Sequence, residues 1–178
     1  LISSCGTDKG SAKMVPLRQP GEYYIPVLND KADDGRELKA GLVGCGGRGT
    51  GAAANMLEAA NGIKFTAFGD VFQDRIDEAV ASLTEWGYDV SGAQQFVGFD
   101  AYKKVIDSGV DVVILTTPPA FRPFQFQYAV SKGVHAFLEK PVAVDAKGCR
   151  DVIAAAKQAV ARNLAVVTGT QRHHQRCY

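Results

Sequence analysis

The chain has 178 residues, of which 46% are hydrophobic and 22% charged, a composition typical of a globular protein rather than a disordered one. The formal net charge of +1 gives no electrostatic case for binding nucleic acid, and no apolar run approaches the length needed to cross a bilayer. The length is sufficient for one domain with a substantial core.

The first 37 residues differ in character from the rest of the chain. They carry Gly, Ser, Pro, Asp and Lys without a helical or strand period, which predicts a linker with an extended lead-in at 22–28. The opening Leu1-Ile2-Ser3-Ser4-Cys5-Gly6 is similar to the end of a bacterial lipoprotein signal, in which small residues precede a lipidated Cys. On this interpretation Cys5 carries a lipid anchor and the protein is periplasmic or membrane-anchored. The alternative is a chance match and a cytoplasmic protein.

The other cysteines carry no recognisable metal or disulfide pattern. Cys45, Cys149 and Cys177 are scattered, without a C-x-x-C pair. We therefore expect no metal site, and we interpret Cys45 as a small packed residue.

From Leu38 onward, strand and helix patterns alternate. The expected strands are 38–43, 63–69, 96–97, 111–116, 134–138 and 165–168, and the expected helices are 48–60, 72–86, 100–107, 123–132 and 145–162. The unbroken β-branched run of the fourth strand is typical of a parallel sheet covered on both faces. Helical crossovers between the strands predict an α/β fold with one doubly wound parallel sheet, a Rossmann fold, over residues 38–170.

The first strand runs into a glycine-rich turn, with the pattern G-x-G-x-x-G at Gly44, Gly46 and Gly49. Gly44 allows a tight strand-to-helix turn, Gly46 leaves room for a pyrophosphate to approach the backbone, and Gly49 lets the helix pack close to the strand. The next helix presents free N–H groups and its positive end to the phosphates. Gly47 and Arg48 complete this turn, and we place them with the cofactor-binding residues.

Asp70 ends the second strand, 21 residues after Gly49. An acidic side chain at this place can accept both ribose hydroxyls of an adenosine, and it would repel a 2′-phosphate, so it favours NAD over NADP. The alternative for Asp70 is a cap for the next helix.

Ligands of doubly wound sheets bind beyond the carboxyl ends of the strands. Besides the glycine turn and Asp70, those ends provide these candidate cofactor-binding residues: Thr116, Thr117, Pro118, Glu139, Lys140, Gln171 and Arg172.

With the glycine turn and Asp70 before it, the tripeptide Glu139-Lys140-Pro141 resembles a pattern of the glucose–fructose oxidoreductase / inositol dehydrogenase (Gfo/Idh/MocA) family. Thr117-Pro118-Pro119 and the run 135–138 add to the resemblance, which extends from about Lys39 to the end of the chain. It implies an NAD-binding Rossmann domain followed by an α+β domain that binds sugars or polyols and mediates homo-oligomer formation. Residues 171–178 would begin the connection to that domain, which this chain lacks.

The resemblance also implies roles for single residues. Lys140 would be the catalytic residue, near the nicotinamide and the reacting hydroxyl, and Glu139 would help hold the nicotinamide ribose and Lys140. Pro141 would be a cis-proline. Arg75 would lie on the adenine face. The alternative for Glu139 and Lys140 is a surface ion pair at a strand end.

The sequence departs from the family pattern at Arg122, where many relatives have a histidine shortly after the fourth strand. Arg122 could hold an anionic or hydroxylated group or cap the helix.

Three functions follow from the resemblance. The first is an NAD-dependent oxidoreductase of a sugar, polyol or derivative, of which this chain would be the cofactor-binding portion, inactive alone. The second is an NAD-assisted glycoside-cleaving enzyme, which oxidises a sugar carbon, eliminates the aglycone and reduces the carbon again. The third is a truncated NAD-binding module without turnover.

Overall fold

The computed structural model describes residues 37–174. The six strands are β1 (Leu38–Val43), β2 (Ile63–Asp70), β3 (Gln94–Val97), β4 (Val112–Leu115), β5 (His135–Leu138) and β6 (Val166–Thr168). The helices are α1 (Gly47–Ala59), α2 (Gln73–Glu85), α3 (Ala101–Asp107), α4 (Arg122–Lys132), α5 (Ala146–Ala161) and the short 3-10 helix η1 (Gln171–His174). Residues 1–36 of the predicted linker, which include Cys5, and Cys177 near the other end lie outside the described residues.

All six strands are parallel and form one sheet in the order β3-β2-β1-β4-β5-β6. The sequence prediction of a doubly wound sheet is therefore confirmed, and the strand order reverses between β1 and β4. At such a reversal the crossovers leave the sheet in opposite directions, which opens a crevice at the carboxyl ends of the strands.

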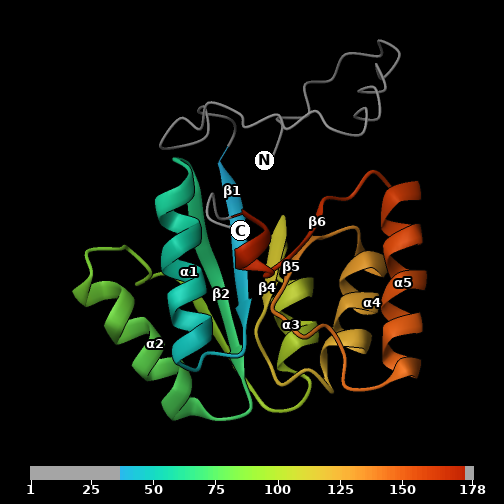
Figure 1. Cartoon of the computed structure of the whole chain (residues 1–178). Helices are drawn as coiled ribbons and strands as arrows, with labels where there is room; N and C mark the ends of the chain where they lie inside the picture. Colours follow the sequence, from blue (N-terminus) through green and yellow to red (C-terminus); the bar gives the residue numbers. More distant parts are fainter. Residues whose placement is uncertain (1–36, 175–178) are drawn as a thin grey trace.

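Helices cover both faces of the sheet and bury two apolar cores (Figure 1). On one face α1 and α2 pack through side chains that include Ala53, Ile76 and Leu83. On the other face α3, α4 and α5 pack through side chains that include Val105 and Phe126. Because both faces of β4 are covered, all four of its residues are buried, as its β-branched sequence predicts.

The predicted elements match the observed ones closely, with two local differences. β3 begins at Gln94, two residues before the expected strand, because its exposed glutamines form a polar edge strand against Ala67 and Phe68. The sequence also predicts Asp100 as the N-cap of α3, but its side chain makes no capping hydrogen bond and pairs with Lys103 at 3.2 Å instead.

Within residues 37–174, no helix combines the length and the hydrophobicity that a membrane span requires.

Candidate functional site

The turn between β1 and α1 is tightly packed at two of the three glycines of the G-x-G-x-x-G pattern. Gly44 has a φ of +94°, and a Cβ there would lie 2.7 Å from the backbone nitrogen of Thr117. A Cβ on Gly49 would lie 1.9 Å from the carbonyl oxygen of Gly44. These two positions therefore accept only glycine, for the reasons predicted from the sequence.

Gly46 is different, because a Cβ there would meet no atom within 4 Å. It is the N-cap residue of the 13-residue helix α1, which has no side-chain cap and no acidic residue in its first turn. Gly47 and Arg48, the first two helical residues, are exposed. The open space before Gly46 thus faces backbone N–H donors and the positive end of a helix, an arrangement suited to a phosphate group.

Thr116, directly after β4, forms hydrogen bonds with the backbone of the glycine turn. Its hydroxyl lies 2.6 Å from the carbonyl oxygen of Gly44 and 3.0 Å from that of Val43, and its backbone nitrogen donates to Val43 at 2.9 Å. The single hydroxyl proton is therefore used within the protein. Next to it, the half-buried Thr117 hydroxyl bonds to Gln125 at 2.6 Å, and Pro118 is exposed.

Asp70 lies beside the same turn. One carboxylate oxygen accepts from the backbone nitrogen of Cys45 at 2.6 Å, and the other accepts from that of Phe72 at 3.1 Å. Asp70 does not occupy the N-cap position of α2, which Phe72 holds. Each carboxylate oxygen retains a lone-pair site, so Asp70 can still accept ribose hydroxyls.

Three of the predicted cofactor-binding residues, Arg75, Gln171 and Arg172, are exposed. Arg75 is exposed on α2, where its guanidinium pairs with Glu78 of the same helix at 3.2 Å. Gln171 and Arg172 are exposed in η1, directly after β6.

Glu139, at the end of β5, is only 3% exposed. Its Oε1 accepts from Nε and Nη2 of Arg48, both at 2.7 Å, and its Oε2 accepts from the backbone nitrogen of Lys140 at 3.0 Å. A Cβ on Gly169 would lie 2.9 Å from Oε1, so the chain after β6 packs directly against this carboxylate. The ion pair joins the first turn of α1 to the end of β5, which the sequence alone did not predict.

Removing Arg48 should destabilise the fold, because it leaves a buried carboxylate without its cation. We expect Arg48→Ala to lower the free energy of unfolding by about 1–3 kcal/mol, since one partner of the pair is buried and the other is half exposed. Urea denaturation measures this change. Arg75→Ala is the matched control, because it removes an exposed ion pair and should cost less than about 0.5 kcal/mol. Equal losses in the two variants would contradict the prediction.

Lys140 is exposed at the carboxyl edge. Among residues 37–174, no ion pair or hydrogen bond involves its ammonium group. The alternative of a Glu139–Lys140 surface ion pair is therefore wrong, since Glu139 is buried and pairs with Arg48. The peptide bond between Lys140 and Pro141 is cis, as the resemblance implies.

Cys45 is a packed residue of the glycine turn, 1% exposed, as predicted. Burial, and secondarily the charge of Asp70, raise the pKa of its thiol to about 12. The thiol therefore stays protonated at neutral pH. We expect iodoacetamide at about pH 8 to label exposed Cys149 and to leave Cys45 unmodified until the protein unfolds, as read by peptide mass spectrometry. Labelling of both at similar rates in the folded protein would contradict this.

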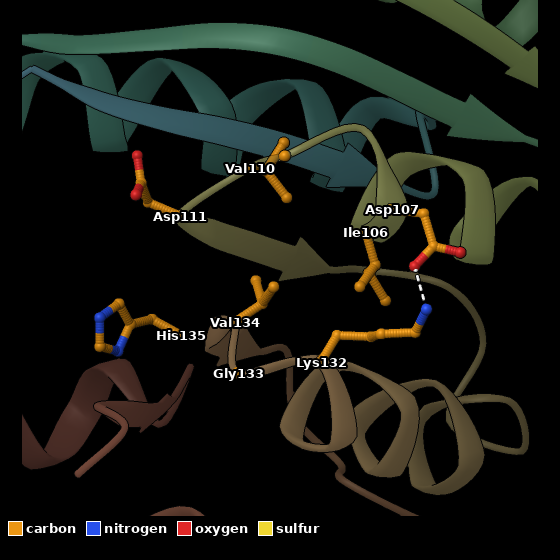
Figure 2. Close-up of a pocket in the computed structure, with 9 residues that line it drawn as sticks. Ile106, Asp107, Val110, Asp111, Lys132, Gly133, Val134 and His135 are labelled. Atoms are coloured by element: carbon orange, nitrogen blue, oxygen red, sulfur yellow. Dashed lines mark ion pairs between the residues drawn. The ribbon is translucent and has the colours of Figure 1, made fainter. Parts of the chain in front are cut away.

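An open cavity of about 360 Å³ lies at the opposite edge of the sheet, near the amino ends of β4 and β5. Figure 2 shows the Asp107–Lys132 ion pair on its wall and the side chains of Asp111 and His135. The ion pair joins Nζ of Lys132 to Oδ1 of Asp107 at 2.7 Å. None of the residues predicted to bind a cofactor lines this cavity. Among the described residues, no cluster of three or more His, Cys, Asp or Glu side chains could hold a metal ion.

The strand order, the glycine turn with an open helix N-terminus, and an acidic residue at the end of β2 define a dinucleotide-binding Rossmann domain. Residues 38–168 match the model of the GFO_IDH_MocA family, described as an oxidoreductase family with an NAD-binding Rossmann fold. The chain belongs to this family and carries its NAD-binding domain.

Curated relatives include Inositol 2-dehydrogenase 4 of Saccharopolyspora erythraea, which is 32% identical over 120 residues, 67% of this chain and 33% of the relative. Glycosyl hydrolase family 109 protein 2 of a Shewanella species is 27% identical over 143 residues, 80% of this chain and 30% of the relative. This chain thus spans about a third of the length of these relatives.

Among solved structures, the scyllo-inositol dehydrogenase of Lactobacillus casei with bound NAD(H) and scyllo-inositol has a TM-score of 0.64 at 22% identity. The match covers 79% of this chain and 38% of that one, and it supports the fold.

Proposed function

We propose that this chain is the cofactor-binding part of an NAD-dependent oxidoreductase that acts on a sugar, a polyol or a derivative of one. The observation that carries the proposal is the exposed Lys140 ammonium at the same edge of the sheet as the glycine turn and Asp70. NAD, when bound, supplies a hydride acceptor. A lysine near the reacting carbon can exchange a proton with the substrate hydroxyl.

The residues around Lys140 fit this role. Glu139 accepts a hydrogen bond from the backbone nitrogen of Lys140 and is itself neutralised by Arg48. The buried carboxylate therefore fixes the backbone of the lysine and leaves its ammonium group open to a substrate. The carboxylate of Asp70 provides acceptors for the adenosine ribose and favours NAD over NADP.

A polyol or sugar substrate is supported by the names of the relatives, which include inositol dehydrogenases. The alternative of an NAD-assisted glycoside-cleaving enzyme is supported by the Shewanella proteins named as glycosyl hydrolases. A third proposal, a binding module without turnover, applies to this chain by itself.

We also propose a lipid anchor at Cys5, and with it a periplasmic or membrane-anchored location. Its support is the short lipoprotein-like sequence at 1–6. For the whole protein we propose a homo-oligomer. Mass analysis of the protein extracted from bacterial membranes would test the anchor, and light scattering of a longer form would test the oligomer.

The function is tested first by calorimetric titration of NAD and NADP into this chain, after denaturing extraction to detect cofactor carried through purification. We expect NAD to bind in preference to NADP, and binding of neither would count against the proposal. A longer form is then assayed with free inositols and with aryl glycosides. Net NADH formation from a free polyol supports the dehydrogenase, whereas glycoside cleavage without net NADH supports the alternative.

A further inference from the structure

Arg122 is the first residue of α4, yet it is only 5% exposed. Its Nη1 donates to the carbonyl oxygen of Glu139 at 2.8 Å and also to that of Pro141. These two carbonyl groups flank Lys140 in the chain. A side chain on α4 therefore holds both sides of the turn that carries the lysine.

The backbone of Lys140 is held on a third side as well. Its nitrogen donates to the Oε2 of Glu139 at 3.0 Å, and Glu139 is fixed in turn by Arg48. Together with the bond from the Glu139 nitrogen to the carbonyl oxygen of Leu115 at 3.0 Å, four hydrogen bonds thus hold the backbone at residues 139–141, whereas the Lys140 side chain is exposed.

The two roles left open by the sequence for Arg122 do not fit this geometry. A guanidinium carries donors only, so it cannot cap the N–H groups at the start of α4. Because Arg122 is only 5% exposed and its Nη1 is bonded to two carbonyl oxygens, it offers little surface to an anionic or hydroxylated group.

The placement of Arg122 is unfavourable by itself. A cation near the positive end of a helix is destabilised, burial lowers the pKa of its guanidinium, and its buried Nε has no hydrogen-bond partner among the described residues. The two carbonyl bonds and the attraction of Glu139 offset this cost.

We propose that Arg122 is a positioning residue for Lys140, which fixes the turn at residues 139–141 and so the origin of the lysine side chain. The catalytic consequence rests on the proposed function, but the positioning itself does not. In this role Arg122 acts only through Lys140 and contacts neither substrate nor cofactor.

The test compares three variants of this chain. Arg122→Met keeps the apolar stem and removes the donors. Arg122→Lys keeps the charge and can still donate to carbonyl groups, although less well than a planar guanidinium. Arg150→Met makes the same chemical change at an exposed position of α5 and serves as the control.

The first readout needs no cofactor. Hydrogen exchange of the Lys140 backbone amide should be at least about 10-fold faster in Arg122→Met, intermediate in Arg122→Lys and unchanged in Arg150→Met. The Val113 amide in the central strand β4 should not change. Unchanged exchange at Lys140 would overturn the proposal, and so would faster exchange spread equally over α4, α5 and the sheet. If Arg122→Met does not fold, the comparison of Arg122→Lys with wild type decides by the same criterion.

The second readout is the NMR signal of ¹³C-dimethylated Lys140, assigned by its absence in Lys140→Arg, as NAD is added. We expect Arg122→Met to lose at least half of the NAD-induced shift while NAD affinity changes less than about threefold. A full shift in that variant would overturn the proposal. If wild type binds no NAD, the proposed function fails, and the exchange experiment alone decides the role of Arg122.

Discussion

Replacing Asp70 with alanine should weaken NAD binding by about 10- to 100-fold, because the carboxylate can accept two charge-assisted hydrogen bonds from one ribose. The same change should reduce the preference for NAD over NADP, since it removes the repulsion of a 2′-phosphate. Calorimetric titration of both cofactors into wild type and variant measures both effects. Unchanged NAD affinity would show that the ribose lies elsewhere.

Two controls separate the ribose contact from the structural role of Asp70. Because Asp70 also accepts from the backbone nitrogens of Cys45 and Phe72, its loss could loosen the glycine turn. Asp70→Asn retains one carbonyl acceptor for the turn, so we expect it to bind NAD between wild type and alanine. Asp74→Ala, an exposed change in the first turn of α2, should leave both affinities unchanged.

Alanine at Gly46 should mainly affect NAD affinity, whereas alanine at Gly49 should mainly affect the stability of the fold. A Cβ on Gly46 meets no protein atom within 4 Å, so we expect stability within about 0.5 kcal/mol of wild type. NAD affinity should nevertheless fall by about 10-fold or more, because the methyl group occupies the space through which a pyrophosphate approaches the backbone.

Gly49→Ala should instead lower the free energy of unfolding by about 3 kcal/mol, because its Cβ would lie 1.9 Å from a backbone oxygen that cannot move independently. This loss exceeds the gain of about 1 kcal/mol that alanine brings to a helix interior. Urea denaturation and NAD titration of both variants test the pair, with Gly92→Ala as the control in an open loop. Equal stability losses at Gly46 and Gly49 would contradict the assignment.

The fold was predictable because its strongest patterns are local. Continuous β-branched runs identify buried parallel strands, and residues with a strong preference for helix ends lie at two of them: a left-handed Gly133 follows α4, and the Asp145 side chain caps α5. The predicted bounds were least accurate for β3, because its polar edge-strand residues show no alternation of apolar and polar side chains.

The site was predictable only as a set of strand ends. Sheet topology brings the glycine turn, Asp70 and Lys140 to one edge, and the sequence order of the strands is enough to infer that. The pairing of Arg48 with Glu139 joins side chains 91 residues apart, and no spacing in the sequence predicts it. The same holds for Arg122, whose partners are backbone carbonyls, since any residue can supply those.

β1 and β4 are neighbours in the centre of the sheet but lie far apart in the sequence. This separation affects how the chain folds during synthesis on the ribosome. β1 is the first of the six described strands to be made, yet Val43 pairs with Leu115 of β4 only after 72 further residues have been added. At translation rates of 5–20 residues per second, that delay is about 4 to 14 seconds. During this time the nascent chain carries an apolar strand with one open edge, the kind of segment that chaperones shield from aggregation.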